Sequence, residues 1–323
     1  MPKDIVWATK ETVVQPKGGL VIENPQEQDH VLGAAVAGPD FEVLVPDGQW
    51  HAYLPGAEIQ RNRFGDTFMC VSFSHQNACE IIVNRRYGDL MNMSDIFLGV
   101  GSGTTRGEGN SKRAVAEWAR LNGFVLETDY PYTPDMTLDQ VYAPLTAALL
   151  AKGKANLDKW SFLYKWVGSS TPGALKDALR YSPLQVDVTG TYPMNEKGIV
   201  QYDKSPFCHE VLIFGYEDGV CWHVFDSEAS QYIRFAWDYP FGSPMLHSLK
   251  KKATPMIYKE KGKPALAVKH PTEPLLIAFS GGSVRASDLF FALYGATDFK
   301  QLPIKEVDKF EFPIGHLINT NLA

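Results

Sequence analysis

The sequence has few cysteines. It contains only Cys70, Cys79, Cys208 and Cys221 among 323 residues, and none of them form a CxxC pair. A chain of this size can bury a core without disulfides, so free thiols in a reducing compartment are expected. No apolar run approaches the roughly 18 residues that span a bilayer, and the N-terminus lacks one of signal-peptide length. These absences predict a cytoplasmic protein without a membrane partner.

Excess positive charge is also missing. The chain carries 31 Lys and Arg against 37 Asp and Glu, a net charge of -6. Binding to nucleic-acid phosphates requires a basic face, so no nucleic-acid partner is expected. Apolar residues make up 45% of the chain, which is enough for a substantial core.

Turn signals and charge divide the chain into four parts. Residues 1–57 are rich in Gly, Pro and Val and predict short strands and loops. Residues 58–247 form the main domain. Residues 248–263 carry six lysines against one glutamate, which predicts a solvated basic linker. Residues 264–323 predict a small module with a strand at 275–280 and a helix at 286–294.

Helical and strand patterns segregate within the main domain. Helices are expected over 66–87, where Asp66 or Thr67 can serve as the N-cap, over 112–123 and over 170–181. From residue 184 onward the pattern is typical of strands.

The Asp218-Gly219 dipeptide between apolar stretches predicts a two-residue hairpin. Its register places Val211 opposite Asp226, with His209 diagonal to Asp226 on the same face, within reach of a side-chain contact. The same register separates Cys208 from Cys221 by more than 25 Å at about 3.4 Å per residue, too far for a shared metal. No metal site is expected.

Cys70 lies in the first turn of the helix predicted over 66–87. A helix N-terminus lowers a thiol pKa, a histidine can hold the thiol proton, and a carboxylate can orient the histidine. Cys70, His209 and Asp226 supply these three roles. The alternative for Cys70 is a buried structural thiol, since free cysteine is among the most buried residue types.

Six short motifs, in order, resemble the papain-like cysteine peptidases. They are "CVSFS" after the nucleophile, "MSDIF", "RGEGN", "LNGFVLETDYPYT", "CHEVLIFGY" and "WHVFDS". The separation of Cys70 and His209 also falls within the roughly 130–150 residues typical of papain-type enzymes. "MCVSFS" with "FDSEASQYIRFAWDYPFG" is most similar to divergent phage and bacterial members, so association with a virus particle is an alternative location.

The resemblance implies a two-lobed α+β fold, with a helical lobe, an antiparallel sheet lobe and a cleft between them. It implies a peptidase acting on a peptide or protein substrate without a cofactor. Asp226 stands where the family usually has asparagine, which also accepts the imidazole N–H, so Asp226→Asn is expected to keep substantial activity. Gly107 and Gly109 are expected at the edge where the substrate backbone approaches.

One departure from the family concerns the oxyanion hole. The family's glutamine should stand six residues before the nucleophile, where this chain has Phe64, and the nearest substitute is Gln60. Phenylalanine has no donor to stabilise developing negative charge. Two alternatives therefore stay open. One is a weakly active or inactive fold that acts as a structural or binding component, and the other is a peptidase that cleaves cell-wall cross-links.

Overall fold

A computed structural model describes residues 5–23, 31–32, 41–56 and 58–252, and strands within the C-terminal part. The chain divides into two compact units, Met1–Lys251 and Lys252–Ala323. The stretch expected as a basic linker, 248–263, holds the end of strand β8 and all of strand β9. The helix expected at 286–294 lies outside the described residues.

The helices of the first unit come mostly before its strands. They are η1 (His51–Tyr53), α1 (Cys70–Tyr87), α2 (Asp95–Gly101), α3 (Lys112–Asn122), α4 (Leu138–Val141), α5 (Ala147–Leu157) and α6 (Pro172–Leu179). The helix predicted over 112–123 is α3, which ends at Gly123, and the helix predicted over 170–181 is α6. Ser111 caps α3 by accepting a hydrogen bond from the Ala114 N–H.

The strands of the first unit form a mixed sheet in the order β1-β2-β8-β3-β5-β6-β7-β4. The central strands from β2 to β7 pair antiparallel, and the short β1 and β4 pair parallel at the edges. Their bounds are β1 (Val31–Leu32), β2 (Trp160–Val167), β3 (Leu184–Thr189), β4 (Ile199–Val200), β5 (Phe207–Glu217), β6 (Cys221–Asp226), β7 (Gln231–Ala236) and β8 (Gly242–Lys251).

The second unit contains a separate sheet in the order β12-β9-β10-β11-β13. Its strands are β9 (Met256–Glu260), β10 (Leu266–Lys269), β11 (Leu276–Phe279), β12 (Ile304–Val307) and β13 (His316–Ile318). β11 falls within the strand expected at 275–280.

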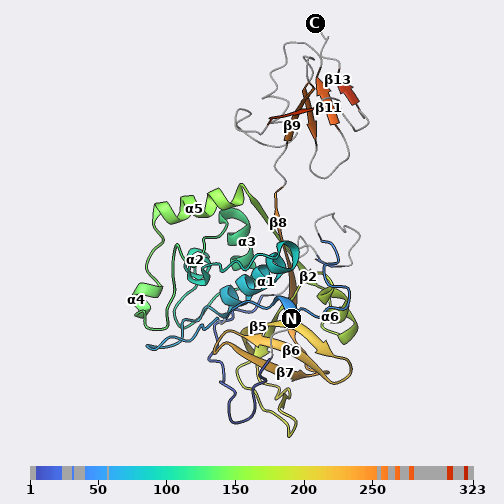
Figure 1. Cartoon of the computed structure of the whole chain (residues 1–323). Coiled ribbons are helices and arrows are strands. Elements are labelled where there is room, and N and C mark those ends of the chain that lie inside the picture. Colours follow the sequence, from blue (N-terminus) through green and yellow to red (C-terminus); the bar gives the residue numbers. More distant parts are fainter. Residues whose placement is uncertain are drawn as a thin grey trace. The chain divides into compact units, whose positions relative to one another are not determined.

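Helix α1 packs against α2 and α3 and also against strands β3, β5 and β8 of the sheet (Figure 1). Every residue from Cys70 to Val83 is buried, including polar ones such as Gln76 and Glu80. A helix covered on all sides is expected to lack a simple amphipathic stripe. This arrangement of a helical part against an antiparallel sheet confirms the predicted α+β class.

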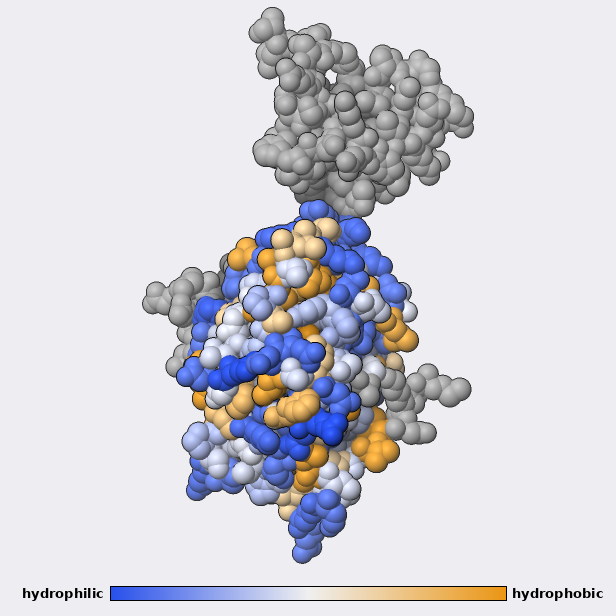
Figure 2. All heavy atoms as spheres, turned by 90° about the vertical axis from the view of Figure 1, so that its left-hand side faces the viewer, coloured by the Kyte–Doolittle hydropathy of each residue, from blue (hydrophilic) through white to orange (hydrophobic). Residues whose placement is uncertain are grey.

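The surface of the helical side is mixed in polarity. Figure 2 shows hydrophobic residues in small groups separated by polar ones among the coloured, described residues. None of the helices in the described part of the chain is both long enough and apolar enough to cross a membrane.

Candidate active site

Cys70 is the first residue of α1, so the predicted helix begins later than the expected Asp66 or Thr67. The cause is the backbone just before it, because Phe68 has a φ of 53°, which breaks helical continuity. Asp66 accepts hydrogen bonds through its Oδ1 from the N–H of Phe68 at 2.7 Å and from Gln60 Nε2 at 3.2 Å. Cys70 therefore stands in the first turn of α1, where the N–H groups of a helix have no intrahelical acceptor and favour negative charge.

The sheet holds the first turn of α1 in place. Gln185 on β3 donates through its side-chain amide to the carbonyl of Val71 at 2.8 Å and to Ser74 Oγ at 2.8 Å. Its Oε1 contacts His247 Nε2 on β8 at 3.0 Å. These buried polar contacts tie the first turn of α1, which bears the thiol, to β3, and β3 pairs with β5, the strand that carries His209.

The structure brings His209 and Asp226 together. The Nε2 of His209 lies 2.9 Å from Asp226 Oδ1, and both side chains are fully buried. The hairpin turn is one residue longer than predicted, because Glu217 pairs with Cys221 instead of Val220. A bulge between Ile213 and Gly215 then restores the predicted register.

The charges of the site depend on each other. Burial raises the pKa of the Cys70 thiol, although His209 acts to lower it. Burial acts to lower the pKa of His209, but Asp226 and Cys70 outweigh it and raise that pKa well above its usual value. Burial acts to raise the pKa of Asp226, and the contact with His209 outweighs it and lowers that pKa. The contact between the two side chains therefore favours the ionised form of Asp226 and the protonated form of His209.

Because Nε2 of His209 contacts Asp226, Nδ1 is the ring nitrogen that remains to exchange a proton with Cys70. Nδ1 makes no hydrogen bond of ordinary geometry with any described residue. Each group nevertheless affects the pKa of the other: His209 acts to lower that of the Cys70 thiol, and Cys70 acts to raise that of the His209 imidazole.

Gln60 lies in the same polar network, and Phe64 does not. Gln60 is fully buried, its N–H donates to the carbonyl of Ser227 at 2.7 Å, and its Oε1 accepts from Ser227 Oγ at 3.3 Å. Phe64 is 56% exposed. The structure thus places Gln60 beside the strand end that carries Asp226.

The two glycines expected at a substrate edge differ. A Cβ at Gly109 would lie 1.8 Å from the carbonyl oxygen of Gly19, whereas one at Gly107 would meet nothing within 4 Å. Both have positive φ, 88° and 83° respectively. Only Gly109 is therefore at a close backbone approach, and the approaching backbone belongs to the N-terminal part of this chain.

Residues Gly18–Val21, here called the cover, lie against the site. The N–H of Leu20 donates to the carbonyl of Cys208 at 3.1 Å, next to His209. The N–H of Val21 donates to the carbonyl of Asn110 at 2.8 Å, and the N–H of Asn110 donates to the carbonyl of Gly19 at 3.0 Å. The Leu20 side chain packs in the same buried cluster as Cys70. Sequence patterns gave no signal for this long-range pairing.

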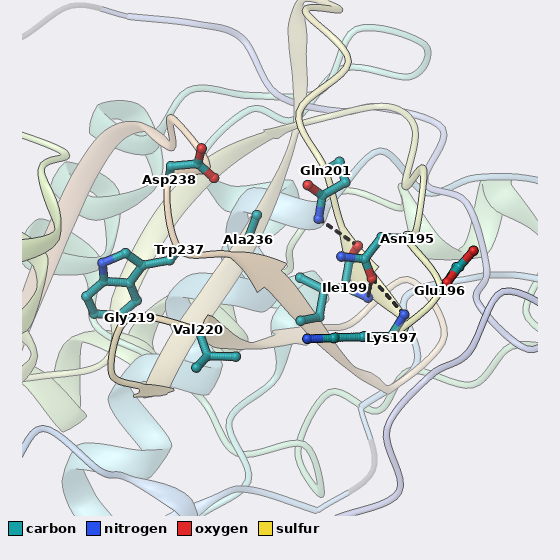
Figure 3. A pocket seen from close by; sticks show the side chains of 10 residues that line it. All are labelled: Asn195, Glu196, Lys197, Ile199, Gln201, Gly219, Val220, Ala236, Trp237 and Asp238. Carbon is teal, nitrogen blue, oxygen red and sulfur yellow. Dashed lines mark hydrogen bonds between the residues drawn. The ribbon is translucent and has the colours of Figure 1, made fainter.

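No cluster of three or more metal-ligating side chains occurs among the described residues. All four cysteines are free, as predicted. A separate open pocket of about 740 Å³ lies on the sheet side, between the 195–201 loop and the turns at Gly219 and Trp237 (Figure 3). It contains none of the predicted site residues.

A thiol at the start of a helix, beside a histidine–carboxylate pair, is the arrangement by which a cysteine is activated to attack a carbonyl carbon. No protein-family model matches the sequence, and no curated protein matches it.

Two solved structures are similar to it. Bromelain from Ananas comosus, solved with the E64 inhibitor, is 19% identical with a TM-score of 0.47, over 62% of this chain and 98% of that chain. Digestive procathepsin L 3 of Tenebrio molitor larval midgut is 18% identical with a TM-score of 0.41, over 65% and 75% respectively. Similarities this low leave the chemistry to be argued from this chain's own side chains.

Proposed function

We propose that this protein is a papain-like cysteine peptidase that hydrolyses peptide or amide bonds through Cys70, His209 and Asp226. The observation that carries this proposal is the buried His209–Asp226 pair at 2.9 Å beside a thiol at the start of α1. The expected substrate is a peptide or protein, and the chemistry requires no metal or organic cofactor. The sequence motifs support the narrower proposal of a phage or bacterial type, cytoplasmic or in a virus particle.

The reaction uses each group in turn. The Cys70 sulfur attacks the substrate carbonyl carbon as a thiolate, its proton held on His209 Nδ1. The imidazolium then protonates the leaving amine, and a thioester remains on Cys70. A water molecule, deprotonated by His209, attacks the thioester and releases the acid. Asp226 keeps the Nε2 proton in place throughout.

The oxyanion is stabilised by donors on the helix side. The Cys70 N–H is one, and Gln60 Nε2 is the nearest side-chain amide before the nucleophile. Gln60 Nε2 now donates to Asp66 at 3.2 Å, so it must turn toward the substrate oxygen during the reaction. Phe64 has no donor to offer.

A second candidate is a structural or binding component, for example of a phage particle, that keeps the fold without catalysis. The full burial of Cys70 and His209 favours it. The two functions differ in the state of the thiol, because an imidazolium-paired thiolate reacts near pH 5–6, where ordinary thiols are protonated.

The test exposes the full chain to an epoxide peptidase inhibitor at pH 6 and locates the adduct by peptide mass spectrometry. Peptidase function predicts labelling at Cys70 alone, with Cys79, Cys208 and Cys221 as internal controls, and casein hydrolysis that Cys70→Ala abolishes at an unchanged melting temperature. Casein hydrolysis that survives in Cys70→Ala would refute the proposal. A thiol of ordinary reactivity, even in a variant with a loosened cover, would favour the non-catalytic function.

A further inference from the structure

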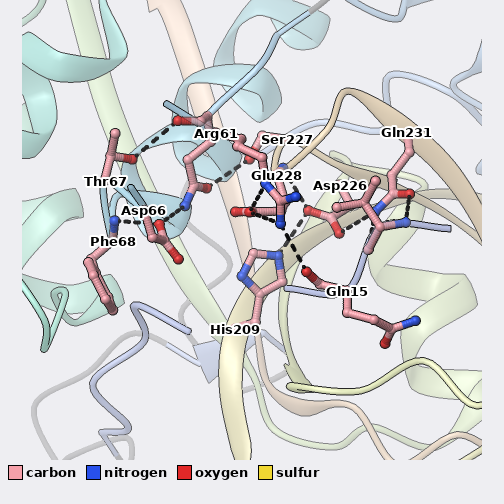
Figure 4. A network of polar contacts seen from close by, with 12 residues as sticks. Gln15, Arg61, Asp66, Thr67, Phe68, His209, Asp226, Ser227, Glu228 and Gln231 are labelled. Atoms are coloured by element: carbon pink, nitrogen blue, oxygen red, sulfur yellow. Dashed lines mark hydrogen bonds and ion pairs between the residues drawn. The ribbon is translucent and has the colours of Figure 1, made fainter. Parts of the chain in front are cut away.

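Asp226 accepts four hydrogen bonds, two on each carboxylate oxygen. Oδ1 faces His209 Nε2 at 2.9 Å and the N–H of Glu228 at 2.9 Å. Oδ2 accepts from Gln231 Nε2 at 3.1 Å (Figure 4), and it also accepts from the Tyr192 hydroxyl at 3.0 Å. An ionised carboxylate only accepts hydrogen bonds, so its surroundings match its charged form at every position.

These hydrogen-bond partners disfavour asparagine at position 226, although the resemblance to papain-like peptidases implies that asparagine can replace Asp226. If the amide nitrogen replaced Oδ2, it would face Gln231 Nε2, which is also a donor. If it replaced Oδ1, it would face the N–H of Glu228 and leave His209 without an acceptor. Each arrangement buries two donors against each other, which costs more than the loss of one hydrogen bond. The hydrogen-bond partners of Asp226 therefore argue against the expectation that Asp226→Asn keeps substantial activity.

Gln231 has one orientation because Val14 holds both ends of its amide. The N–H of Val14 donates to Gln231 Oε1 at 2.9 Å, and Gln231 Nε2 donates to the carbonyl of Val14 at 2.7 Å. A flip of the amide would place donor against donor and acceptor against acceptor. Gln231 therefore always presents an N–H to Asp226.

Tyr192 is held by Gln15, the residue after Val14 in the N-terminal segment. Its N–H donates to Gln15 Oε1 at 2.6 Å, and its ring packs edge-on against Phe235 with centroids 5.4 Å apart. Burial, and then the Asp226 carboxylate, raise the pKa of Tyr192 well above its usual value. The hydroxyl therefore stays a donor across the working pH range.

We propose that Tyr192 and Gln231 are positioning residues that hold the Asp226 carboxylate toward His209, and that Val14 and Gln15 hold these two side chains in turn. This inference rests on the proposed function for its catalytic meaning. Its geometric content, a carboxylate fixed by the N-terminal segment, stands on the contacts alone. Residues 14–15 thus contact the partners of Asp226, while the cover contacts Cys208 and Asn110.

Several other charged groups lie near the His209–Asp226 pair. Glu228 is paired with Arg61 at 2.8 Å, and its carboxyl pKa also responds to Asp66 and His209. Cys70 and the buried Glu210 lie beside His209. None of these donates a side-chain hydrogen bond to Asp226 Oδ2 among the contacts of the described residues, so that oxygen reports on Tyr192 and Gln231 specifically.

The test follows the titration of the Asp226 carboxyl carbon by NMR on the full chain, with ¹³C-labelled aspartate and Asp226→Asn for assignment. It needs neither a substrate nor access to Cys70. Tyr192→Phe and Gln231→Met each remove one donor, so the Asp226 midpoint should move to higher pH in both. Gln15→Ala should move it in the same direction by less, and Lys10→Ala, exposed on the same segment, should leave it unchanged.

Turnover provides the second readout. Loss of one hydrogen bond to a charged group should lower kcat about tenfold to a hundredfold in Tyr192→Phe and in Gln231→Met. Neither change should lower it further in an Asp226→Asn background, because both act through the carboxylate. Gln15→Ala serves if a buried variant does not fold, since Gln15 is exposed.

An Asp226 titration equal to wild type in both variants would overturn the inference, as would equal losses of kcat with and without Asp226. A shifted Asp226 in a wild-type protein that neither hydrolyses casein nor reacts with the epoxide would leave the positioning role intact and reject the peptidase. If the wild type hydrolyses casein but the Asp226 titration midpoint is unchanged in the variants, the peptidase function stands and the positioning role is rejected.

Discussion

Opening of the cover should limit access to Cys70, and Leu20→Asp should release it. The Leu20 side chain is 8% exposed, and the cover makes three backbone hydrogen bonds, one to Cys208 and two to Asn110. Burial of a leucine side chain stabilises by about 1.5–3 kcal/mol, and each backbone bond by about 0.5–1.5 kcal/mol. The closed state is thus favoured by about 3 to 7 kcal/mol, an open fraction on the order of 10⁻² to 10⁻⁵.

Aspartate at position 20 removes the leucine term and adds a charge that must be hydrated. The open fraction should then rise at least about tenfold to a hundredfold, and the labelling rate of Cys70 should rise with it. The assay is the pseudo-first-order rate of epoxide labelling at Cys70, resolved by peptide mass spectrometry at pH 6. Hydration of the site should also lower the thiol pKa, because burial is the main cause of its increase.

Val6→Asp is the matched control, since Val6 is 82% exposed on the same N-terminal segment and should leave the rate unchanged. Gly109→Ala is a second route to the open state, because its Cβ would collide with Gly19. Equal labelling rates in Leu20→Asp and wild type, at equal melting temperatures, would show that the cover does not control access.

Three further predictions concern Gln60, Glu58 and the N-terminal segment. Gln60→Ala should lower kcat about a hundredfold with little change in KM or melting temperature, as expected for an oxyanion donor, and wild-type turnover would remove Gln60 from the mechanism. Burial, then Glu127, raises the pKa of Glu58 to about 7, so the wild type should lose stability as pH rises from about 4.5 through 7. Glu58→Gln should therefore be more stable than the wild type above pH 7, by up to about 3 kcal/mol in the free energy of unfolding, and equally stable at pH 4. Deletion of residues 1–22 should speed labelling of Cys70 yet lower kcat relative to Leu20→Asp, because it removes the support of Gln231 with the cover; equal kcat values would contradict this.

The contacts that local patterns govern were predictable from sequence. A turn signal and a period of two are enough to bring His209 to Asp226, even though the turn is one residue longer than expected, because the bulge beside Gly215 compensates. Cys70 is the start of α1, but the exact first residue depends on the positive φ of Phe68, which a helical pattern does not reveal. Gln60 was found only as the nearest amide, and its burial follows from contacts with Ser227.

The supporting residues could not be found this way, for a physical reason. Leu20, Val14 and Gln15 bond to residues far along the chain through single backbone groups or lone side chains, which carry no period. Tyr192 and Gln231 are equally ordinary as sequence letters. Only the folded arrangement shows that every partner of the Asp226 carboxylate is a donor.

The two contacts of the N-terminal segment have opposite consequences for chemistry at Cys70. The cover keeps the thiol buried, and burial favours its neutral form. Val14 and Gln15 stabilise the ionised Asp226, which favours the imidazolium that a thiolate needs. Gln15 and Gly18 are separated by Pro16 and Lys17, so the cover can lift while residues 14–15 stay bound only if the backbone conformation changes within this short stretch. A working enzyme of this design therefore needs displacement of the cover and retention of residues 14–15, which distinguishes it from one activated by loss of the whole segment.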